Sequence, residues 1–201
     1  MAMVTLGRRM KMKRLLIYSA ALAILGAVLC AVSQTGGLPE PYGSLIGQTL
    51  SHSIDVIYLT LCGVFLVFGP LRHKESRPVR LAWVAGSVAL NFAVVQLLKK
   101  LVFWARPVDV GEIASTASRG SGFPSGHTVP AFLIAVLVGY IEPRLQIPAL
   151  VVAGLIGYSR AEVTAHFPIQ VWLSALIGIL LGVVCTTIYD RITKQRRDLA
   201  D

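Results

Sequence analysis

Long apolar runs separated by short polar breaks dominate the chain. A helix of about 20 apolar residues crosses the hydrocarbon core of a bilayer, and six stretches come close to that length. They predict an all-α, polytopic membrane protein, with one membrane-embedded domain over residues 1–201. The predicted transmembrane helices are residues 15–33, 54–71, 81–101, 127–141, 147–160 and 168–189. The fourth and fifth are short for a span, and a polar break that contains Pro143 separates them.

The first apolar run follows a cluster of basic residues in segment 1–14, an arrangement that is also typical of a signal peptide. The run is long for the apolar part of a signal, and further apolar runs follow it. We therefore interpret it as an uncleaved first span, with a cleaved signal as the alternative.

The distribution of Lys and Arg predicts how these helices are oriented. With the N-terminus inside, fourteen of the 19 basic residues fall in cytoplasmic segments, which are 1–14, 72–80, 142–146 and 190–201. This bias follows the positive-inside rule and predicts that both termini are cytoplasmic. Membrane orientation thus accounts for the net charge of +9, and we expect no nucleic-acid partner. Only 14% of residues are charged, well below the roughly 25% of soluble proteins.

The composition does not indicate a metal site or a disulfide framework. Cys30, Cys62 and Cys185 all lie in apolar runs, without CxxC spacing or neighbouring histidines. Carboxylates are not clustered as they are in magnesium sites. We therefore expect no metal and no cofactor. Gly178 and Gly182 form a small-xxx-small pair, which predicts close helix packing.

Five basic residues remain on the predicted outer side: Lys99, Lys100, Arg106, Arg119 and Arg160. Three of them lie in short segments that also contain, or face, histidines. Charged residues near membrane depth are candidates for function, because burying them there is costly. The outer face is therefore where we expect the active site.

Two of these segments flank the loop between the third and fourth predicted helices. Lys99 and Arg106 are seven residues apart, so they share a face if the third helix continues that far. The segment Gly122–His127 opens the fourth helix. Within it Ser125 is a natural N-cap, and Gly126 allows another group to approach the backbone closely.

The third segment joins the fifth and sixth helices. Ser159 and Arg160 are followed, after five residues, by His166, and Pro168 begins the sixth helix. The fourth and sixth helices both run from outside to inside, so both present their N-termini to the outer face. Helix N-termini bind phosphate well because they offer free N–H groups and partial positive charge. The combination predicts a site for a phosphoryl group.

These segments resemble the three motifs of the type 2 phosphatidic acid phosphatase superfamily, which are KxxxxxxRP, PSGH and SRxxxxxHxxxD. Here they read Lys99 to Pro107, Pro124 to His127 and Ser159 to Gln170. Sixteen residues separate the first two motifs, and 31 separate the second from the third. The resemblance covers the chain from the third helix to the sixth.

The resemblance implies a metal-independent phosphatase mechanism. His166 would attack phosphorus to form a phosphohistidine, and His127 would protonate the leaving lipid oxygen as a general acid. Cations would stabilise the charge of the transition state. The implied phosphate-binding residues are Lys99, Arg106, Ser125, Gly126 and Arg160, with Pro124, Ser159 and Glu162 in secondary positions.

One position departs from the family pattern. The Asp that orients the nucleophilic histidine is replaced by Gln170. The carbonyl oxygen of Gln170, four residues after His166, can accept the ring N–H, but it supplies no negative charge. Three interpretations stay open: Gln170 suffices, another acid such as Glu162 or Asp55 substitutes, or the protein is a weak or inactive homologue.

The resulting hypothesis is a lipid phosphatase of a bacterial inner membrane with its active site facing the periplasm. The resemblance implies four candidate substrates, namely lipid A phosphate, undecaprenyl pyrophosphate, phosphatidylglycerol phosphate and phosphatidic acid, with the first two slightly favoured. Phosphotransfer to an acceptor lipid is an alternative. A lipid-phosphate-binding or transport protein without chemistry is another, and Gln170 is the feature that favours it. The sequence does not indicate an oligomeric state.

Overall fold

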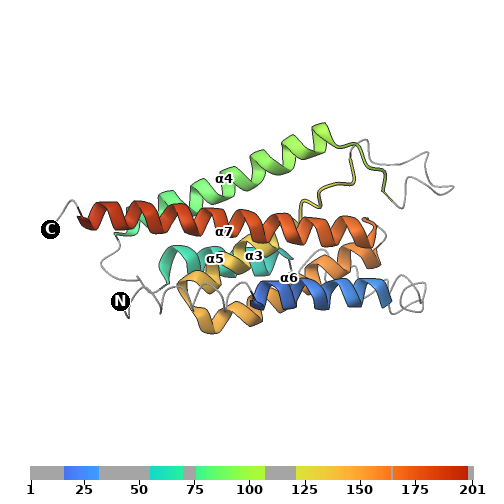
Figure 1. Ribbon diagram of the computed structural model, residues 1–201, viewed down its shortest axis with the longest axis horizontal. Coiled ribbons are helices and arrows are strands. Elements are labelled where there is room, and N and C mark those ends of the chain that lie inside the picture. The colour runs from blue at the N-terminus through green and yellow to red at the C-terminus, as the bar shows by residue number, and fades with distance from the viewer. Residues whose placement is uncertain (1–15, 32–54, 70–75, 107–120, 164, 199–201) are drawn as a thin grey trace.

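The computed structural model describes residues 16–31, 55–69, 76–106, 121–163 and 165–198, and these residues form helices without a strand among them (Figure 1). An N-terminal helix, Leu16–Ala31, precedes the labelled elements. The labelled elements are α3 (Asp55–Phe68), α4 (Arg77–Leu101), α5 (Thr128–Ile141), the 3-10 helix η4 (Pro143–Leu145), α6 (Gln146–Glu162) and α7 (Pro168–Asp198).

Each of the six predicted spans coincides with one of these helices, and the boundaries differ most for α7. This helix continues to Asp198, whereas the predicted span ends at residue 189. The extension is polar, so its hydrophobicity did not mark it as helix. The predicted break after α5 is present as η4, where the Glu142 side chain accepts a hydrogen bond from the backbone N–H of Arg144 at 3.2 Å.

Two of the described helices, Arg77–Leu101 and Pro168–Gln195, are long and apolar enough to cross a bilayer by themselves. Shorter apolar helices are Leu16–Ala31, Val56–Phe68 and Thr128–Ile141. The number of spans and the side on which the termini lie therefore stay predictions. The surface of α4 favours a lipid environment, because large apolar side chains such as Phe92 (64% exposed) face outwards.

The helix α5 is the centre of the bundle. It packs against α3, α4, α6 and α7, and all of its residues except Pro130 are buried. A helix that is apolar on every side is stable only when other helices surround it. Tyr58 of α3 reinforces this arrangement, since its hydroxyl lies 3.2 Å from the carbonyl oxygen of Ala131 and 3.1 Å from that of Ala149.

The predicted glycine pair of α7 is where α5 and α7 meet. A Cβ atom on Gly178 would lie 2.4 Å from the backbone oxygen of Val129, and one on Gly182 would lie 2.6 Å from Cβ of Val136. No side chain fits at these distances, so glycine allows the two backbones to touch. This confirms the interpretation of Gly178 and Gly182 as packing positions.

An aromatic cluster joins α4, α5 and α7 at the end of the bundle where α4 begins and α7 ends. The rings of Trp83 and Tyr189 stack with centroids 4.4 Å apart, and Tyr140 lies 5.6 Å from Trp83. The indole N–H of Trp83 donates to the carbonyl oxygen of Cys185 at 2.9 Å. The contacts hold these three helices together at the end that lies opposite the loops described below (Figure 1).

We expect Gly178→Ala to lower the melting temperature of the protein. The added methyl group must displace the α5 backbone, and overpacking of this kind costs about 1–3 kcal/mol. Gly86→Ala on α4 is the matched control, since a Cβ atom there meets nothing within 4 Å. In a helix, Gly to Ala is otherwise favourable by about 1 kcal/mol, so the control should be neutral or stabilising. Equal melting temperatures for both variants would contradict the proposed contact.

Candidate functional site

The predicted site segments meet at one end of the bundle. There α4 and α6 end and α5 and α7 begin (Figure 1), and the described residues 102–106 and 121–127 form irregular backbone. The segments 102–106 and 121–123, which are not adjacent in the sequence, pair here through one backbone hydrogen bond and through the Ser121 side chain. The site is therefore assembled by tertiary contacts.

The pairing of these two segments depends on Ser121 and Gly122. The N–H of Gly122 donates to the carbonyl oxygen of Trp104 at 2.7 Å, and the Ser121 hydroxyl donates to that of Val102 at 2.6 Å. A Cβ atom on Gly122 would lie 2.8 Å from Cγ of Arg106 and 3.0 Å from the Trp104 oxygen. Glycine is thus required here by the close approach of the segment that carries Arg106.

The PSGH segment is anchored to α5 and α7. The buried hydroxyl of Ser125 accepts a hydrogen bond from the backbone N–H of Thr128 at 3.3 Å. The backbone N–H of Ser125 donates to Oγ of Ser174 at 2.8 Å. Ser125 makes the predicted capping contacts, because its carbonyl oxygen also accepts the N–H of Val129 at 3.2 Å. The regular helix begins at Thr128, and His127, the residue directly before it, makes no side-chain capping hydrogen bond.

Cationic side chains surround this segment. The ammonium Nζ of Lys99 lies 3.7 Å from the position that a Cβ atom on Gly126 would occupy. Arg106 packs against Gly122, and the charges of both Arg106 and Arg160 act on His166. Within the described part of the chain, no group of three His, Cys, Asp or Glu side chains is placed to hold a metal ion. The ligand that suits these cations is an anion.

The imidazole of His166 is buried, with 3% of the residue exposed. Its Nδ1 atom lies 2.7 Å from the carbonyl oxygen of Gly122, and its backbone N–H donates to the carbonyl oxygen of Arg160 at 3.1 Å. A carbonyl oxygen accepts hydrogen bonds and cannot donate them, so Nδ1 carries the proton in this contact. The lone pair of the neutral ring is then on Nε2.

The environment of His166 keeps this ring neutral. Burial lowers the pKa of His166 from 6.5 to about 4, and the neighbouring charges of Arg106 and Arg160 act in the same direction. Hydrogen bonds with the Gly122 carbonyl and, to the smallest extent, with the Gln170 side chain oppose the fall in pKa. A neutral imidazole with a free Nε2 lone pair is the form that acts as a nucleophile.

The side chain of Gln170 connects two neighbouring segments. Its Oε1 accepts the backbone N–H of Phe167 at 3.1 Å, and its Nε2 donates to the carbonyl oxygen of Ala105 at 2.8 Å. We expected the Gln170 carbonyl oxygen to accept the ring N–H of His166. In the structure the proton on Nδ1 is donated to Gly122, and Gln170 makes only the smallest of the contributions that raise the pKa of the ring. The reason is that the Gly122 carbonyl is already held beside the ring by the pairing of the two loop segments.

Sequence reasoning missed two serines that support the site. The Ser174 hydroxyl donates to the carbonyl oxygen of Gln170 at 2.6 Å while it accepts the N–H of Ser125. Ser121 contacts four backbone groups, which belong to Val102, Trp104 and Phe123. The signal for Ser174 was available, since it is a lone polar residue one helical turn after Gln170 in an apolar helix. Ser121 lies in a Ser- and Gly-rich stretch with no such signal.

The remaining predicted residues have varied positions. Pro124 follows a cis peptide bond, and the Ser159 hydroxyl donates to the carbonyl oxygen of Ile156 at 2.8 Å, within its own helix. Glu162 accepts a hydrogen bond from the Tyr158 hydroxyl at 3.0 Å. Pro107 and Arg119 lie outside the described residues, as does the side chain of Asp55.

Comparison with known families places most of the helical core in one family. The model of the PAP2 superfamily matches residues 80–194, which is more than half of the chain. The match includes every segment of the site.

Characterised relatives are distant. The chain is 26% identical over 167 residues to a lipid A 1-phosphatase of Rhizobium etli, covering 73% of this chain and 71% of the relative. It is 27% identical over 134 residues to the undecaprenyl-diphosphatase BcrC of Bacillus subtilis, covering 65% of this chain and 66% of the relative. The fold is similar to the crystal structure of a transmembrane PAP2-type phosphatidylglycerolphosphate phosphatase from Bacillus subtilis. The TM-score is 0.55 at 21% identity, and the match covers 88% and 87% of the two chains.

We expect the ring of His166 to titrate near pH 4 in the ligand-free protein. Because its pKa in the fold lies below the ordinary 6.5, the ring stays neutral as the pH falls through 6.5 and becomes charged only near 4. Histidine-selective ¹⁵N NMR of the detergent-solubilised protein measures this midpoint, and the spectrum of His166→Gln assigns the signal. A midpoint near 6.5 would contradict the burial of the ring beside Arg106 and Arg160.

Proposed function

The chain belongs to the PAP2 superfamily, and from this membership we propose that it hydrolyses a phosphomonoester or pyrophosphate of a membrane lipid. The observation that carries this proposal is the surroundings of His166. A neutral imidazole with an available Nε2 lone pair is buried beside Arg106 and Arg160. Cations that disfavour imidazolium favour a bound phosphate, so the same charges keep the nucleophile neutral and attract its target.

We propose that catalysis proceeds in two steps. Nε2 of His166 attacks phosphorus, and the bond from phosphorus to the lipid oxygen breaks as His127 transfers its proton to that oxygen. Water then attacks the phosphohistidine, the N–P bond breaks, and His127 accepts a proton from the water. Inorganic phosphate leaves, and both histidines return to their starting states.

The cations and the backbone would hold the phosphoryl group during both steps. In this proposal Lys99, Arg106 and Arg160 bind its oxygens and neutralise the charge that develops on them. Gly126 contributes a backbone N–H at the start of α5, where the helix dipole adds positive potential. Its lack of a side chain keeps the space next to the Lys99 ammonium open. Because Ser125 is fully buried and bonded to Thr128, its part is to shape this turn.

We propose six transmembrane helices with cytoplasmic termini and a periplasmic site. The described helices alternate in direction along the bundle (Figure 1), as a chain that repeatedly crosses a membrane must. Basic residues at the start of α4 and the end of α7, such as Arg77 and Lys194, lie at the end of the bundle that is remote from His166. That end would face the cytoplasm by the positive-inside rule.

The alternative hypothesis, a protein that binds or transports a lipid phosphate without chemistry, rested on Gln170. The contacts around His166 and Gln170 argue against this alternative. In the family pattern an acidic residue orients the histidine, whereas here the Gly122 carbonyl holds Nδ1. Gln170 connects the Ala105 segment to the start of α7 and so supports this arrangement. We propose that this pair of contacts replaces the orienting function of the acid, without its charge.

We expect His166→Ala to abolish phosphate release from lipid A, undecaprenyl pyrophosphate, phosphatidylglycerol phosphate and phosphatidic acid, tested as a panel. Loss of a nucleophile typically lowers kcat by several orders of magnitude, on the order of 10⁶ in a hydrolase with a comparable covalent step. His127→Ala should slow turnover less, by about 10²–10⁴-fold, because a general acid contributes that much.

The intermediate provides a second measurement. Wild-type protein quenched in base during turnover of a ³²P-labelled substrate should carry label that is stable in base and lost in acid, as expected of a phosphohistidine. His73→Ala, in a residue outside the three motifs, is the control for nonspecific labelling. Label that persists in His166→Ala would exclude this residue as the nucleophile, and absence of turnover on every lipid would favour a binding protein.

We expect Gln170→Asp to lower kcat, although it restores the family residue. Asp is one methylene group shorter and has no N–H, so it cannot donate to the Ala105 carbonyl as Gln170 does at 2.8 Å. It would also bury a carboxylate at a position with no solvent exposure. The loss of one such buried contact, about 1–3 kcal/mol, corresponds to about a 5- to 150-fold decrease in kcat. Gln195→Asp, on the exposed end of the same helix, is the matched control, and a faster Gln170→Asp variant would overturn this role.

A further inference from the structure

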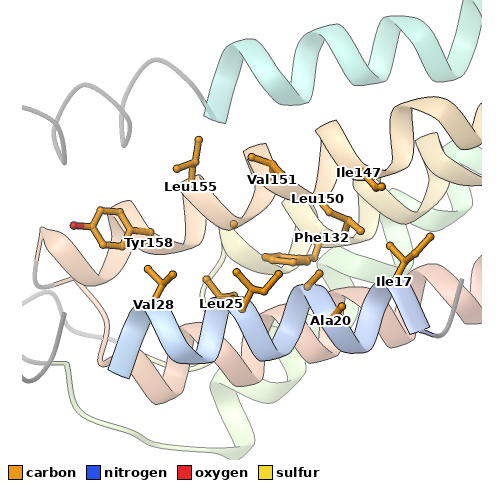
Figure 2. Close-up of a pocket in the computed structure, with 13 residues that line it drawn as sticks. Ile17, Ala20, Leu25, Val28, Phe132, Ile147, Leu150, Val151, Leu155 and Tyr158 are labelled. Atoms are coloured by element: carbon orange, nitrogen blue, oxygen red, sulfur yellow. The ribbon is translucent and has the colours of Figure 1, made fainter. Parts of the chain in front are cut away.

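An apolar groove lies between the N-terminal helix and α6, with α5 as its floor. Its volume is about 410 Å³, within the range of roughly 300–1,000 Å³ that is typical of small-molecule sites. Figure 2 shows the side chains of the two helices along its opposite walls, with Phe132 between them. Several wall residues are largely exposed, among them Ile24 (65%) and Val151 (56%), so the groove is open along its side.

We propose that this groove holds one hydrocarbon chain of the lipid substrate whose phosphate is bound near His166. The proposal rests on the lipid phosphatase function inferred above and adds where the apolar part of the substrate lies. Three features support it: the composition of the walls, the length of the groove, and the position of its ends relative to the site.

The walls suit an alkyl chain and little else. Among the residues that line the groove, Tyr158 alone has a polar side chain. Small residues, Ala20, Ala21 and Gly154, leave the space between the helices open. A Cβ atom on Gly154 would meet nothing within 4 Å, so nothing in the described structure fills this part of the groove. A peptide or a sugar would leave its polar groups without hydrogen-bond partners here.

The length of the groove matches the depth of one leaflet. On the N-terminal helix its lining runs from Ile17 to Val28, and on α6 from Ile147 to Tyr158. Each wall spans eleven residue steps, or roughly 17 Å at 1.5 Å per residue. Half of the hydrocarbon core of a bilayer is about 15 Å. A lipid chain that enters at the level of its headgroup would therefore follow the groove towards the middle of the membrane.

The groove ends beside the residues of the site. Tyr158 marks one end, and Arg160 follows it at a rise of about 3 Å along α6. Phe132, on the floor, lies one helical turn from Thr128 at the start of α5, which directly follows His127. The polar end of the groove is also at this level, where the Tyr158 hydroxyl donates to Glu162. A chain in the groove thus has its headgroup end directed towards the cations.

In this proposal the groove orients the lipid substrate and adds little to its binding free energy. The hydrocarbon of the bilayer is as apolar as the groove walls, so moving a chain from one to the other yields little hydrophobic free energy. Holding the chain along a defined path restricts where the phosphate is presented, and misplacement of a reacting group by about 1 Å can slow a reaction by about 100-fold. The groove should therefore affect long-chain substrates and leave short-chain substrates unchanged.

The test compares Gly154→Leu, which fills the groove, with Gly63→Leu, a matched control on α3 where a Cβ atom also meets nothing within 4 Å. The substrates are the dioleoyl and dihexanoyl forms of a phosphatidic acid or phosphatidylglycerol phosphate that the wild-type protein hydrolyses. We expect Gly154→Leu to lower kcat/KM for the dioleoyl lipid by about tenfold or more and to leave the dihexanoyl lipid within about twofold. Gly63→Leu should change neither. Ala20→Leu, on the opposite wall, should reproduce the effect and serves if Gly154→Leu does not fold.

Each other outcome counts against the proposal. If the ratio of the two kcat/KM values is unchanged in both groove variants, the hydrocarbon chain of the substrate does not lie in this groove. If that ratio is unchanged but a lipid that copurifies with the wild type is lost from Gly154→Leu by native mass spectrometry, the groove holds a bilayer lipid and not the substrate. Equal loss for both substrates would indicate damage to the site. A wild-type protein that releases phosphate from no lipid would instead refute the proposed function, and this proposal with it.

Discussion

The hydrogen bond between Nδ1 of His166 and the carbonyl oxygen of Gly122, at 2.7 Å, determines what the imidazole can do. It assigns the ring proton to Nδ1 and leaves Nε2 as the atom with the lone pair. The bond exists only because Gly122 is held in place from the other side, where its N–H donates to the Trp104 carbonyl. The chemistry of one side chain therefore depends on the pairing of two loop segments.

This pairing depends in turn on how closely the helices approach each other. The glycines of α7 allow its backbone to touch that of α5, which positions Ser174 to bind the N–H of Ser125. Gln170, one turn earlier on α7, reaches the carbonyl oxygen of Ala105. A membrane-embedded helix pair can come this close only where side chains are small. The small residues thus set the distance between the two helices. The buried polar residues form hydrogen bonds that are possible only at that distance.

Polar and apolar surfaces lie at different positions along the length of the bundle. Arg106, Arg160 and His166 lie at one end, where irregular backbone offers hydrogen bonds, whereas the groove beside α6 is lined by alkyl and aromatic groups. An amphiphilic substrate needs both surfaces at a fixed separation, and α6 carries residues of each. The α6 helix thereby connects the proposed recognition of the phosphate to that of the hydrocarbon chain.

The sequence by itself determined the helical class, the approximate helix positions and the family, because apolar run length and short motifs are local properties. It also indicated the close packing at Gly178 and Gly182, and it selected Arg106 and Arg160 together with His166, on whose ring their charges act. Only the tertiary structure decided that Gly122 rather than Gln170 accepts the ring N–H and that Ser174 supports the site. Those contacts join residues up to 49 positions apart, as between Ser125 and Ser174. Which backbone carbonyl reaches which side chain depends on how the helices pack, and no local pattern encodes that.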